Sequence, residues 1–340
     1  MSLLRPALAA CAALAVLGAC SLAPSVRIDA SDRLPVPNGF VRLADDAVLL
    51  PGAYVPGREP DGNSVVFAGP AGLVVVDTGR HAAHTDALLE LAKRAERPLA
   101  AIVNSHWHLD HVGGNPRLRA AHPALRVFAS GAIEGAMGDF LKTYRRQLTE
   151  ASAKAKAADE RARYATEIAL IDQGRALYPD ERIAANATRT LAGREFVVGY
   201  EADAVTGGDV WLLDRDARLL VAGDLVTLPA PFLDTACPLR WQAALKRLEA
   251  QPFDRLVPGH GPVLDRAGFV RYRTAFDNLL KCAASKVDAG TCTTGWHRDA
   301  DPLLPDEADR KAADALLGYY LGQVLRGPEA VRRAKRCAAK

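Results

Sequence analysis

The chain contains a series of short apolar runs bounded by turn residues, a pattern that predicts β-strands. Runs at 73–76, 99–103 and 219–222 consist of Val, Leu, Ile and Ala, and a His or Asp lies within a few residues after each. We therefore expect a β-rich start, then strands that alternate with helices as far as residue 260. The turn signals between residues 40 and 77 are Pro51-Gly52, Pro56-Gly57, Asp61-Gly62 and Gly69-Pro70.

Two parts of the chain show helical periodicity instead. Residues 131–177 are rich in Ala, Lys, Arg and Glu, and their larger apolar residues recur largely at spacings of three and four, so one helix face can pack. Segments 267–285, 305–322 and 328 to the end also predict helices, which we interpret as a cap on the domain. The apolar positions of the first segment are Phe140, Leu141, Tyr144, Leu148, Tyr164, Ile168 and Leu170.

Length and charge narrow the class of protein. The 340 residues are 49% hydrophobic, which suffices for one large domain with appendages. The 43 basic and 40 acidic residues give a net charge of +3, with no electrostatic signature of nucleic-acid binding. We expect a small-molecule partner and no nucleic acid.

The N-terminus predicts export. Arg5 precedes an apolar, Ala-rich stretch within residues 1–19 that is too short to span a bilayer but suits a signal peptide. Leu17-Gly18-Ala19-Cys20 resembles a bacterial lipobox, in which Cys20 is lipidated and anchors the chain to the membrane; Ser21 then favours the outer membrane, facing the periplasm. An ordinary signal peptide with an incidental Cys is the alternative. Residues 20–39, with several prolines, read as a tether.

Four cysteines lie beyond the predicted signal and lipobox, namely Cys237, Cys282, Cys292 and Cys337. An even number in an exported chain predicts disulfides, and four cysteines allow three pairings. Cys282 with Cys292 closes a short loop and is our first choice, which leaves Cys237 for Cys337. A cysteine zinc site is the less favoured alternative, because no close Cys-x-x-Cys pair is present.

Candidate chemistry concentrates in His106-Trp107-His108-Leu109-Asp110-His111, directly after the apolar run 99–103. Two imidazoles two positions apart can reach one cation, and the Asp-His pair behind them can turn to a second. A solvated polar loop is the alternative, but it does not explain this spacing of ligand types. Two later residues in similar settings are Asp224, after the run 219–222, and His260, between Pro258-Gly259 and Gly261-Pro262.

This set of motifs resembles the metallo-β-lactamase superfamily, whose H-x-H-x-D-H signature is matched without a gap. Asp77-Thr78-Gly79 resembles the turn after its early buried strand, and we interpret Asp77 as structural or as a support for the ligands. The resemblance implies one or two zinc ions, with iron or manganese as alternatives, and catalytic roles for Asp110 and Asp224. The implied metal ligands are His106, His108, Asp110, His111, Asp224 and His260.

The resemblance also implies the fold, a mixed α/β protein built as a four-layer αββα sandwich over residues 40–265. The helical segment 131–177 would be an insertion, and residues 266–340 a helical C-terminal extension. Insertions beside the site in this superfamily often wall the substrate, so Tyr144 or Arg145 are candidates for such a wall. Packing in the core is the alternative use of the aromatic positions.

One departure from the family pattern concerns a ligand. The segment 204–209 corresponds to the place of a further His, and Val205 stands there instead; no other His lies between His122 and His260. The site of His106 and His108 thus has two imidazoles, with Asp224, water, Glu201 or Asp203 as possible supplements. A strand over 196–204 would place Asp203 on the same face as Val205. We expect the site of Asp110, His111 and His260 to hold its metal more firmly.

The expected activity is hydrolysis of an ester, thioester, lactone or amide of a small molecule by a metal-activated water. Because Val205 weakens one site, a non-catalytic metal-binding or partner-binding envelope protein on the same fold remains the alternative. An enzyme that works with one metal stands between the two.

Overall fold

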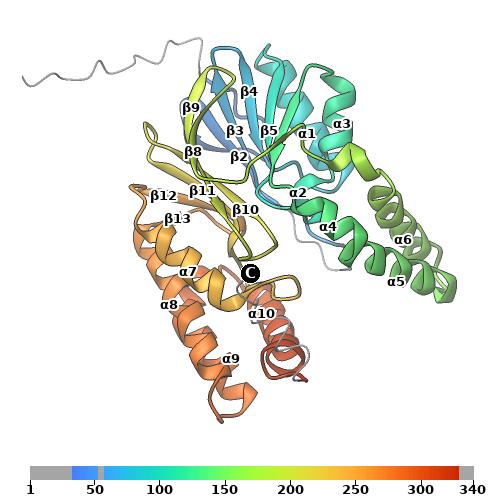
Figure 1. Cartoon of the computed structure of the whole chain (residues 1–340), viewed down its shortest axis with the longest axis vertical. Helices are drawn as coiled ribbons and strands as arrows, with labels where there is room; N and C mark the ends of the chain where they lie inside the picture. The colour runs from blue at the N-terminus through green and yellow to red at the C-terminus, as the bar shows by residue number, and fades with distance from the viewer. Residues whose placement is uncertain (1–32, 53–56, 329–340) are drawn as a thin grey trace, which may run out of the picture.

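The computed structural model describes residues 33–52 and 57–328. Two mixed β-sheets pack face to face, and helices cover their outer faces (Figure 1). The first sheet has seven strands in chain order, and β4 to β7 run parallel to one another. Its strands are β1 (Val41–Ala44), β2 (Ala47–Leu50), β3 (Ser64–Gly69), β4 (Gly72–Val76), β5 (Leu99–Val103), β6 (Arg126–Ala129) and β7 (Glu181–Arg182).

The second sheet has six strands in the order β13-β12-β11-β10-β9-β8. Only β11 and β12 pair in parallel; the other neighbours are antiparallel. β4 and β11 are buried along their whole length because the partner sheet covers one face and helices the other, which explains their unbroken apolar runs. The strands are β8 (Ala187–Leu191), β9 (Arg194–Glu201), β10 (Asp209–Asp214), β11 (Leu219–Thr227), β12 (Arg255–His260) and β13 (Leu264–Asp265).

Three apolar clusters hold the layers together. One lies between the sheets, where Phe67 meets Phe196 edge-on with ring centroids 5.1 Å apart. A second joins the first sheet to α1 (Ala82–Arg94) and α3 (Asn115–Ala121). A third joins the second sheet to α7 (Pro238–Glu249) and α8 (Arg266–Ala283). The predicted four-layer αββα sandwich is confirmed.

The segment predicted as a helical insertion is helical, and it projects from one side of the sheets (Figure 1). Leu141 and Leu148 are buried, as the periodicity predicts, whereas Phe140 at the start of its helix is 37% exposed. A fourth apolar cluster packs this segment on Trp107 and Leu109 beside the predicted ligands. The helices are α4 (Ala132–Gly138), α5 (Phe140–Lys154), α6 (Ala158–Ile171) and the 3₁₀ turn η2 (Gly174–Leu177).

Helices follow the last strand, but they belong to the body of the fold more than to a separate cap. Phe269 and Tyr272 of α8 and Trp296 of α9 (Ala289–Ala300) lie in the cluster of the second sheet. The helix α9, whose N-terminus is capped by Asp288, was not predicted from the sequence. The short η3 (Asp301–Leu303), α10 (Glu307–Tyr319) and a π-helical turn, η4 (Tyr320–Leu325), complete the chain as described.

The Cys282–Cys292 disulfide is present and joins α8 to α9, as predicted. Cys337 lies outside the described residues, so its pairing with Cys237 remains a prediction. The signal segment and Cys20 also lie outside them. Leu34, placed in the predicted tether, is 2% exposed and packs in the core, so the folded domain begins before residue 40.

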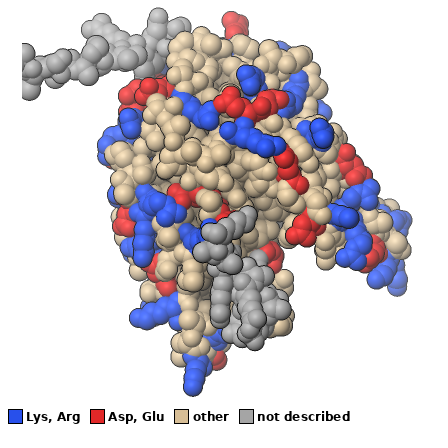
Figure 2. Space-filling view, in the orientation of Figure 1, with Lys and Arg blue, Asp and Glu red and all other residues tan. Residues whose placement is uncertain are grey.

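Surface charge and hydropathy do not point to a particular partner of this protein. Lys and Arg are interspersed with Asp and Glu on the face in Figure 2. Within the described residues, no helix combines the length and apolar character that crossing a bilayer requires.

Candidate metal centre

The six predicted ligand residues converge at one edge of the sandwich. His106 and His108 lie in the loop after β5, and Asp110 and His111 on the short helix α2 (Leu109–Val112). Asp224 lies within β11, and His260 ends β12. The parallel pairs β4–β5 and β11–β12 both end here, which brings residues far apart in sequence to one place.

The first of two ligand groups consists of His106, His108 and Asp224, with one ligand atom of each within 4.8 Å of the others. Nε2 of His106 lies 2.8 Å from Nδ1 of His108 and 3.7 Å from Oδ2 of Asp224. Two imidazole nitrogens and one carboxylate oxygen form a donor set that suits zinc, iron and manganese.

The second group consists of Asp110, His111 and His260. Oδ2 of Asp110 lies 2.9 Å from Nε2 of His260 and 3.5 Å from Nε2 of His111. Oδ1 of Asp224 also faces this group, 3.4 Å from Nε2 of His111 and 3.6 Å from Nε2 of His260. Asp224 therefore stands between the groups with one oxygen toward each.

The residues fit a cation at this place. Oδ1 of Asp224 is buried without a hydrogen-bond partner in the part of the chain that the structure describes, and such a buried acceptor is costly unless something positive meets it. Burial opposes a charge on His111, but Asp110, Asp77 and Asp224 outweigh it and raise its pKa well above the ordinary value. Protons and metal therefore compete for this group.

Asp77 supports the two imidazoles nearest to it. Its Oδ2 accepts from Nδ1 of His111 at 2.8 Å and from the Ser105 hydroxyl at 2.7 Å, and its Oδ1 accepts from the Ser105 backbone N–H at 2.7 Å. Because the Ser105 proton goes to Asp77, the Ser105 oxygen accepts from Nδ1 of His106 at 3.0 Å. Both imidazoles thus keep a proton on Nδ1 and turn Nε2 to the ligand groups, so a metal would have to displace the second proton of His111 from Nε2.

His108 is oriented by Thr235, a residue that no motif in the sequence singles out. The Thr235 hydroxyl donates to the carbonyl of Val205 at 2.9 Å, so its oxygen accepts from Nε2 of His108, also at 2.9 Å. Nδ1 of His108 is then left unprotonated toward His106. Burial lowers the pKa of His108 to about 4, which keeps the ring neutral near neutral pH.

Neither acidic residue proposed to compensate for Val205 reaches the first group. We expected a strand as far as Ala204, but β9 ends at Glu201. Asp203, in a turn with φ of 57°, pairs with Arg240 at 2.7 Å. Glu201 accepts from Arg247 at 2.9 Å, and Val205 is fully buried in the apolar cluster of the second sheet. The prediction that Glu201 or Asp203 completes the first group is therefore wrong.

Two glycines allow the backbone to approach the ligands closely. A Cβ on Gly62 would lie 2.5 Å from Cε1 of His111, and one on Gly259 would lie 1.9 Å from Oδ1 of Asp224. Asn63 ties the two glycine loops together, donating to the carbonyls of Pro258 at 2.9 Å and Gly261 at 3.0 Å. Asn63 was not among the residues predicted from the sequence to belong to the site.

Aromatic rings flank His108. The ring of Trp107 meets the His108 ring edge-on with centroids 4.7 Å apart, and the ring of Phe232 does so at 5.1 Å. Phe140 of the insertion contacts Trp107, with ring centroids 5.4 Å apart. Tyr144 packs beside Phe140, in line with a core role.

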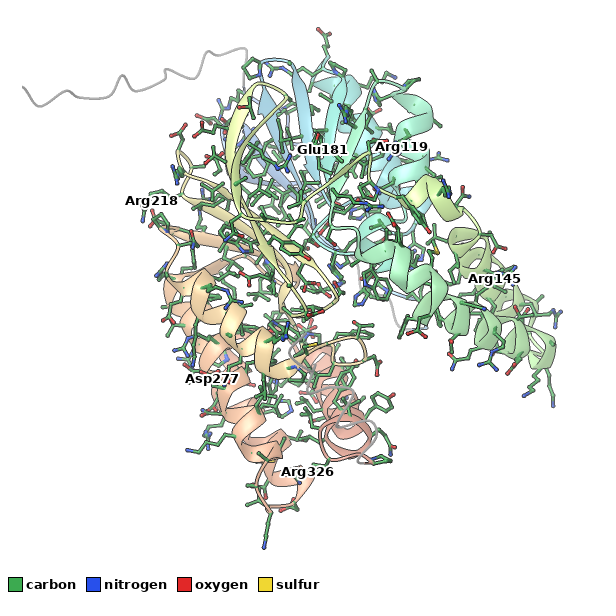
Figure 3. All side chains as sticks on the ribbon, in the orientation of Figure 1. Arg119, Arg145, Glu181, Arg218, Asp277 and Arg326 are labelled. Atoms are coloured by element: carbon green, nitrogen blue, oxygen red, sulfur yellow. A yellow bond between two sulfur atoms is a disulfide. The ribbon has the colours of Figure 1, made fainter. Side chains whose placement is uncertain are left out.

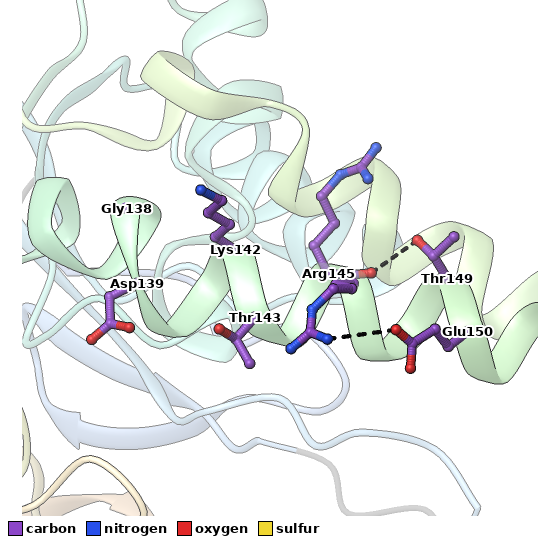
Figure 4. Close-up of a pocket in the computed structure, with 8 residues that line it drawn as sticks. Gly138, Asp139, Lys142, Thr143, Arg145, Thr149 and Glu150 are labelled. Atoms are coloured by element: carbon purple, nitrogen blue, oxygen red, sulfur yellow. Dashed lines mark hydrogen bonds and ion pairs between the residues drawn. The ribbon is translucent and has the colours of Figure 1, made fainter.

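Arg145 instead points to solvent on the projecting insertion, where it pairs with Asp172 (Figure 3). It borders an open hollow of about 560 Å³ along the solvent face of α5 (Figure 4). This hollow contains none of the ligand residues. Its lining consists of Gly138, Asp139, Lys142, Thr143, Arg145, Arg146, Thr149 and Glu150.

Comparison with known proteins agrees with this geometry. Residues 57–260, which include all six predicted ligand residues, match the family model of the metallo-beta-lactamase superfamily. A protein named linear primary-alkylsulfatase, from Pseudomonas sp. (strain ATCC 19151), is 26% identical over 221 residues, which cover 58% of this chain and 41% of that protein. The chain thus matches less than half of that relative's length.

Solved structures show the same fold. A metallo-beta-lactamase from Pontibacter korlensis superimposes with a TM-score of 0.53 and 20% identity, covering 70% of this chain and 98% of that one. One from Hirschia baltica gives a TM-score of 0.50 and 17% identity, with 70% and 96% covered. At these identities the likeness concerns the fold alone.

Proposed function

Because this chain belongs to the metallo-β-lactamase superfamily, we propose that it is a metal-dependent hydrolase that acts with both ligand groups on a small-molecule ester, thioester, lactone or amide. The observation that carries the proposal is the placement of Asp224. Its Oδ2 faces His106 at 3.7 Å, and its Oδ1 faces His111 at 3.4 Å. A carboxylate so placed can serve two cations at once.

In this proposal His106, His108 and Asp224 would hold one cation, and Asp110, His111 and His260 would hold the other, with Asp224 near both. Bound cations would supply a lowered pKa for water and stabilisation of the negative charge that develops in hydrolysis. Asp110 would orient the attacking water through Oδ2, the oxygen that faces the second group, and the rings of Trp107 and Phe232 would exclude other water from beside His108. Zinc is the first candidate metal, with iron or manganese as alternatives.

A second candidate reaction is the hydrolysis of a sulfate ester. It is favoured by the match to a protein whose name describes it as an alkylsulfatase. Both reactions require displacement at an electrophilic centre, carbon in one and sulfur in the other, so the same groups can serve either.

The proposed location is the cell envelope, with the chain anchored through a lipid on Cys20. This rests on the sequence of residues 1–20. Cys20→Ala should abolish incorporation of labelled fatty acid and release the chain from the membrane fraction; unchanged labelling would refute the anchor.

The test of function is metal content per chain together with turnover of carboxylic, thio- and sulfate esters and lactones. The parent should bind about two metals, and His106→Ala and His111→Ala should each lower both content and turnover. One metal that survives His106→Ala but not His111→Ala would indicate a one-metal enzyme. A folded parent that takes up no zinc, iron or manganese would refute the hydrolase and favour the non-catalytic alternative.

A further inference from the structure

Arg80 links the helical insertion to the metal centre. It follows the turn at Asp77-Thr78-Gly79, and its side chain is only 10% exposed. Its Nη2 lies 3.6 Å from Oδ1 of Asp110, and its Nη1 lies 3.3 Å from Oε2 of Glu167 on α6. The backbone N–H of Arg80 donates to Asp61 at 2.7 Å, which fixes where the side chain starts.

The contact with Arg80 divides the two oxygens of Asp110 between different tasks. Oδ2 faces His260 at 2.9 Å and His111 at 3.5 Å, so it belongs to the second ligand group. Oδ1 faces the guanidinium. A carboxylate can rotate about its last bond, and a cation on one side selects the orientation in which the other oxygen points at the ligands.

Glu167 has an unusual position for a charged residue. The buried residues of α6 are Glu167 and Ile171, and Glu167 is 2% exposed. A buried carboxylate is costly unless it is paired, and Arg80 is the cation that meets it. This arrangement makes the position of Arg80 depend on the insertion.

We propose that Arg80 is a positioning residue for Asp110 and that Glu167 holds Arg80 in place, so that the helical insertion sets the metal affinity of the second ligand group. This inference rests on the metal centre of the proposed function. It adds that residues 158–171 act on the centre without touching it.

Coulomb's law distinguishes positioning from plain electrostatics. A guanidinium repels a metal cation, so its charge alone predicts tighter binding when Arg80 is removed. Positioning predicts the opposite, because Asp110 loses its selected orientation. Removal of Glu167 in a chain that already lacks Arg80 should weaken binding further if charge alone acts, and should change nothing if Glu167 works through Arg80.

The experiment measures zinc affinity by competition with a chromophoric chelator, in the full chain carrying His106→Ala so that the second group is the one assayed. Arg80→Met should weaken zinc binding about 10–100-fold, the usual effect of losing a residue that orients a ligand. Arg80→Lys should restore part of this loss. Glu167→Gln should weaken binding by less, and the double variant should match Arg80→Met. The control is Asp172→Asn, which removes the exposed Arg145–Asp172 pair of the same insertion and should have no effect.

Unchanged or tighter zinc binding in Arg80→Met would overturn the proposal while leaving the hydrolase intact. The same holds if Arg80→Met alters the KM of a substrate but not zinc affinity, because Arg80 would then contact the substrate. Failure of the His106→Ala chain to bind zinc, although the parent binds it, would also overturn the proposal. If the parent itself binds no zinc, the proposed function fails as well.

Discussion

Asp77 offers the sharpest test of how the fold prepares the metal centre. In Asp77→Asn, one acceptor oxygen becomes an amide donor. The least costly arrangement turns this amide toward the Ser105 N–H, which leaves that buried donor unpaired at about 1–3 kcal/mol. The bonds from the Ser105 hydroxyl and from His111 lose their charge-assisted character, which adds about 1 kcal/mol. The free energy of unfolding should fall by about 2–4 kcal/mol in total.

The backbone does not confound this substitution. Asp77 has a φ of 59°, and Asn is among the residues that tolerate this region. Zinc affinity should also fall, by about 10–100-fold, because the neutral amide oxygen holds the Nδ1 proton of His111 less firmly than the carboxylate does and makes His111 a weaker ligand. Urea unfolding of the metal-free chain measures the first effect, and chelator competition the second.

Asp214→Asn is the matched control. Asp214 is 2% exposed at the far end of β10 and accepts the backbone N–H groups of Asp216 and Ala217 at 3.0 and 3.1 Å. Asp214→Asn should lower the free energy of unfolding as Asp77→Asn does and should keep the zinc affinity of the parent. Equal loss of stability with unchanged zinc affinity in both variants would refute the role assigned to Asp77 and leave it a turn residue.

Three further outcomes are expected. Thr235→Val removes the acceptor of His108 and should weaken zinc at the first group about 10–100-fold, seen in a zinc titration as loss of one binding step. Burial lowers the pKa of His84 from 6.5 to about 4, so the folded state keeps the ring neutral. The contribution of this group to the free energy of unfolding should be complete above pH 6.5 and fall by about 3 kcal/mol toward pH 4. His84→Gln should flatten this pH dependence in urea unfolding. Cys282→Ser opens the bridge to Cys292, which spans 10 residues, and should cost about 2–3 kcal/mol in thermal or urea unfolding. A reducing agent should cost the parent at least as much, because it would also open the predicted Cys237–Cys337 bridge.

Local patterns predicted the parts of this molecule that depend on local chemistry. The apolar run at 99–103 corresponds to β5, and the His-rich motif behind it lies at the centre because a strand end and its loop are adjacent in sequence. The helix α9 escaped prediction because Gly290, Gly295 and its threonines have low helix propensity; burial of Trp296 and the cap at Asp288 override that tendency.

Contacts between distant segments could not be predicted. Thr235 reaches His108 across a separation of 127 residues, and its hydroxyl resembles that of any other threonine in the sequence. No pattern in the sequence distinguishes Glu167 from the other charged residues of its helix, because its burial depends on how α6 docks. The supplement proposed at Asp203 failed because a strand end cannot be placed to within two residues from propensity, and β9 stops before it.

The loss of an imidazole at Val205 changes the balance between the two groups. The first group retains two imidazoles and Asp224, which matches the three protein ligands and open position of catalytic zinc sites. The second group has its own carboxylate, Asp110, and faces the other oxygen of Asp224 as well. The first group therefore depends on Asp224 for its carboxylate, whereas the second group has Asp224 in addition to its own Asp110. This asymmetry explains why the second group should fill first as metal becomes available.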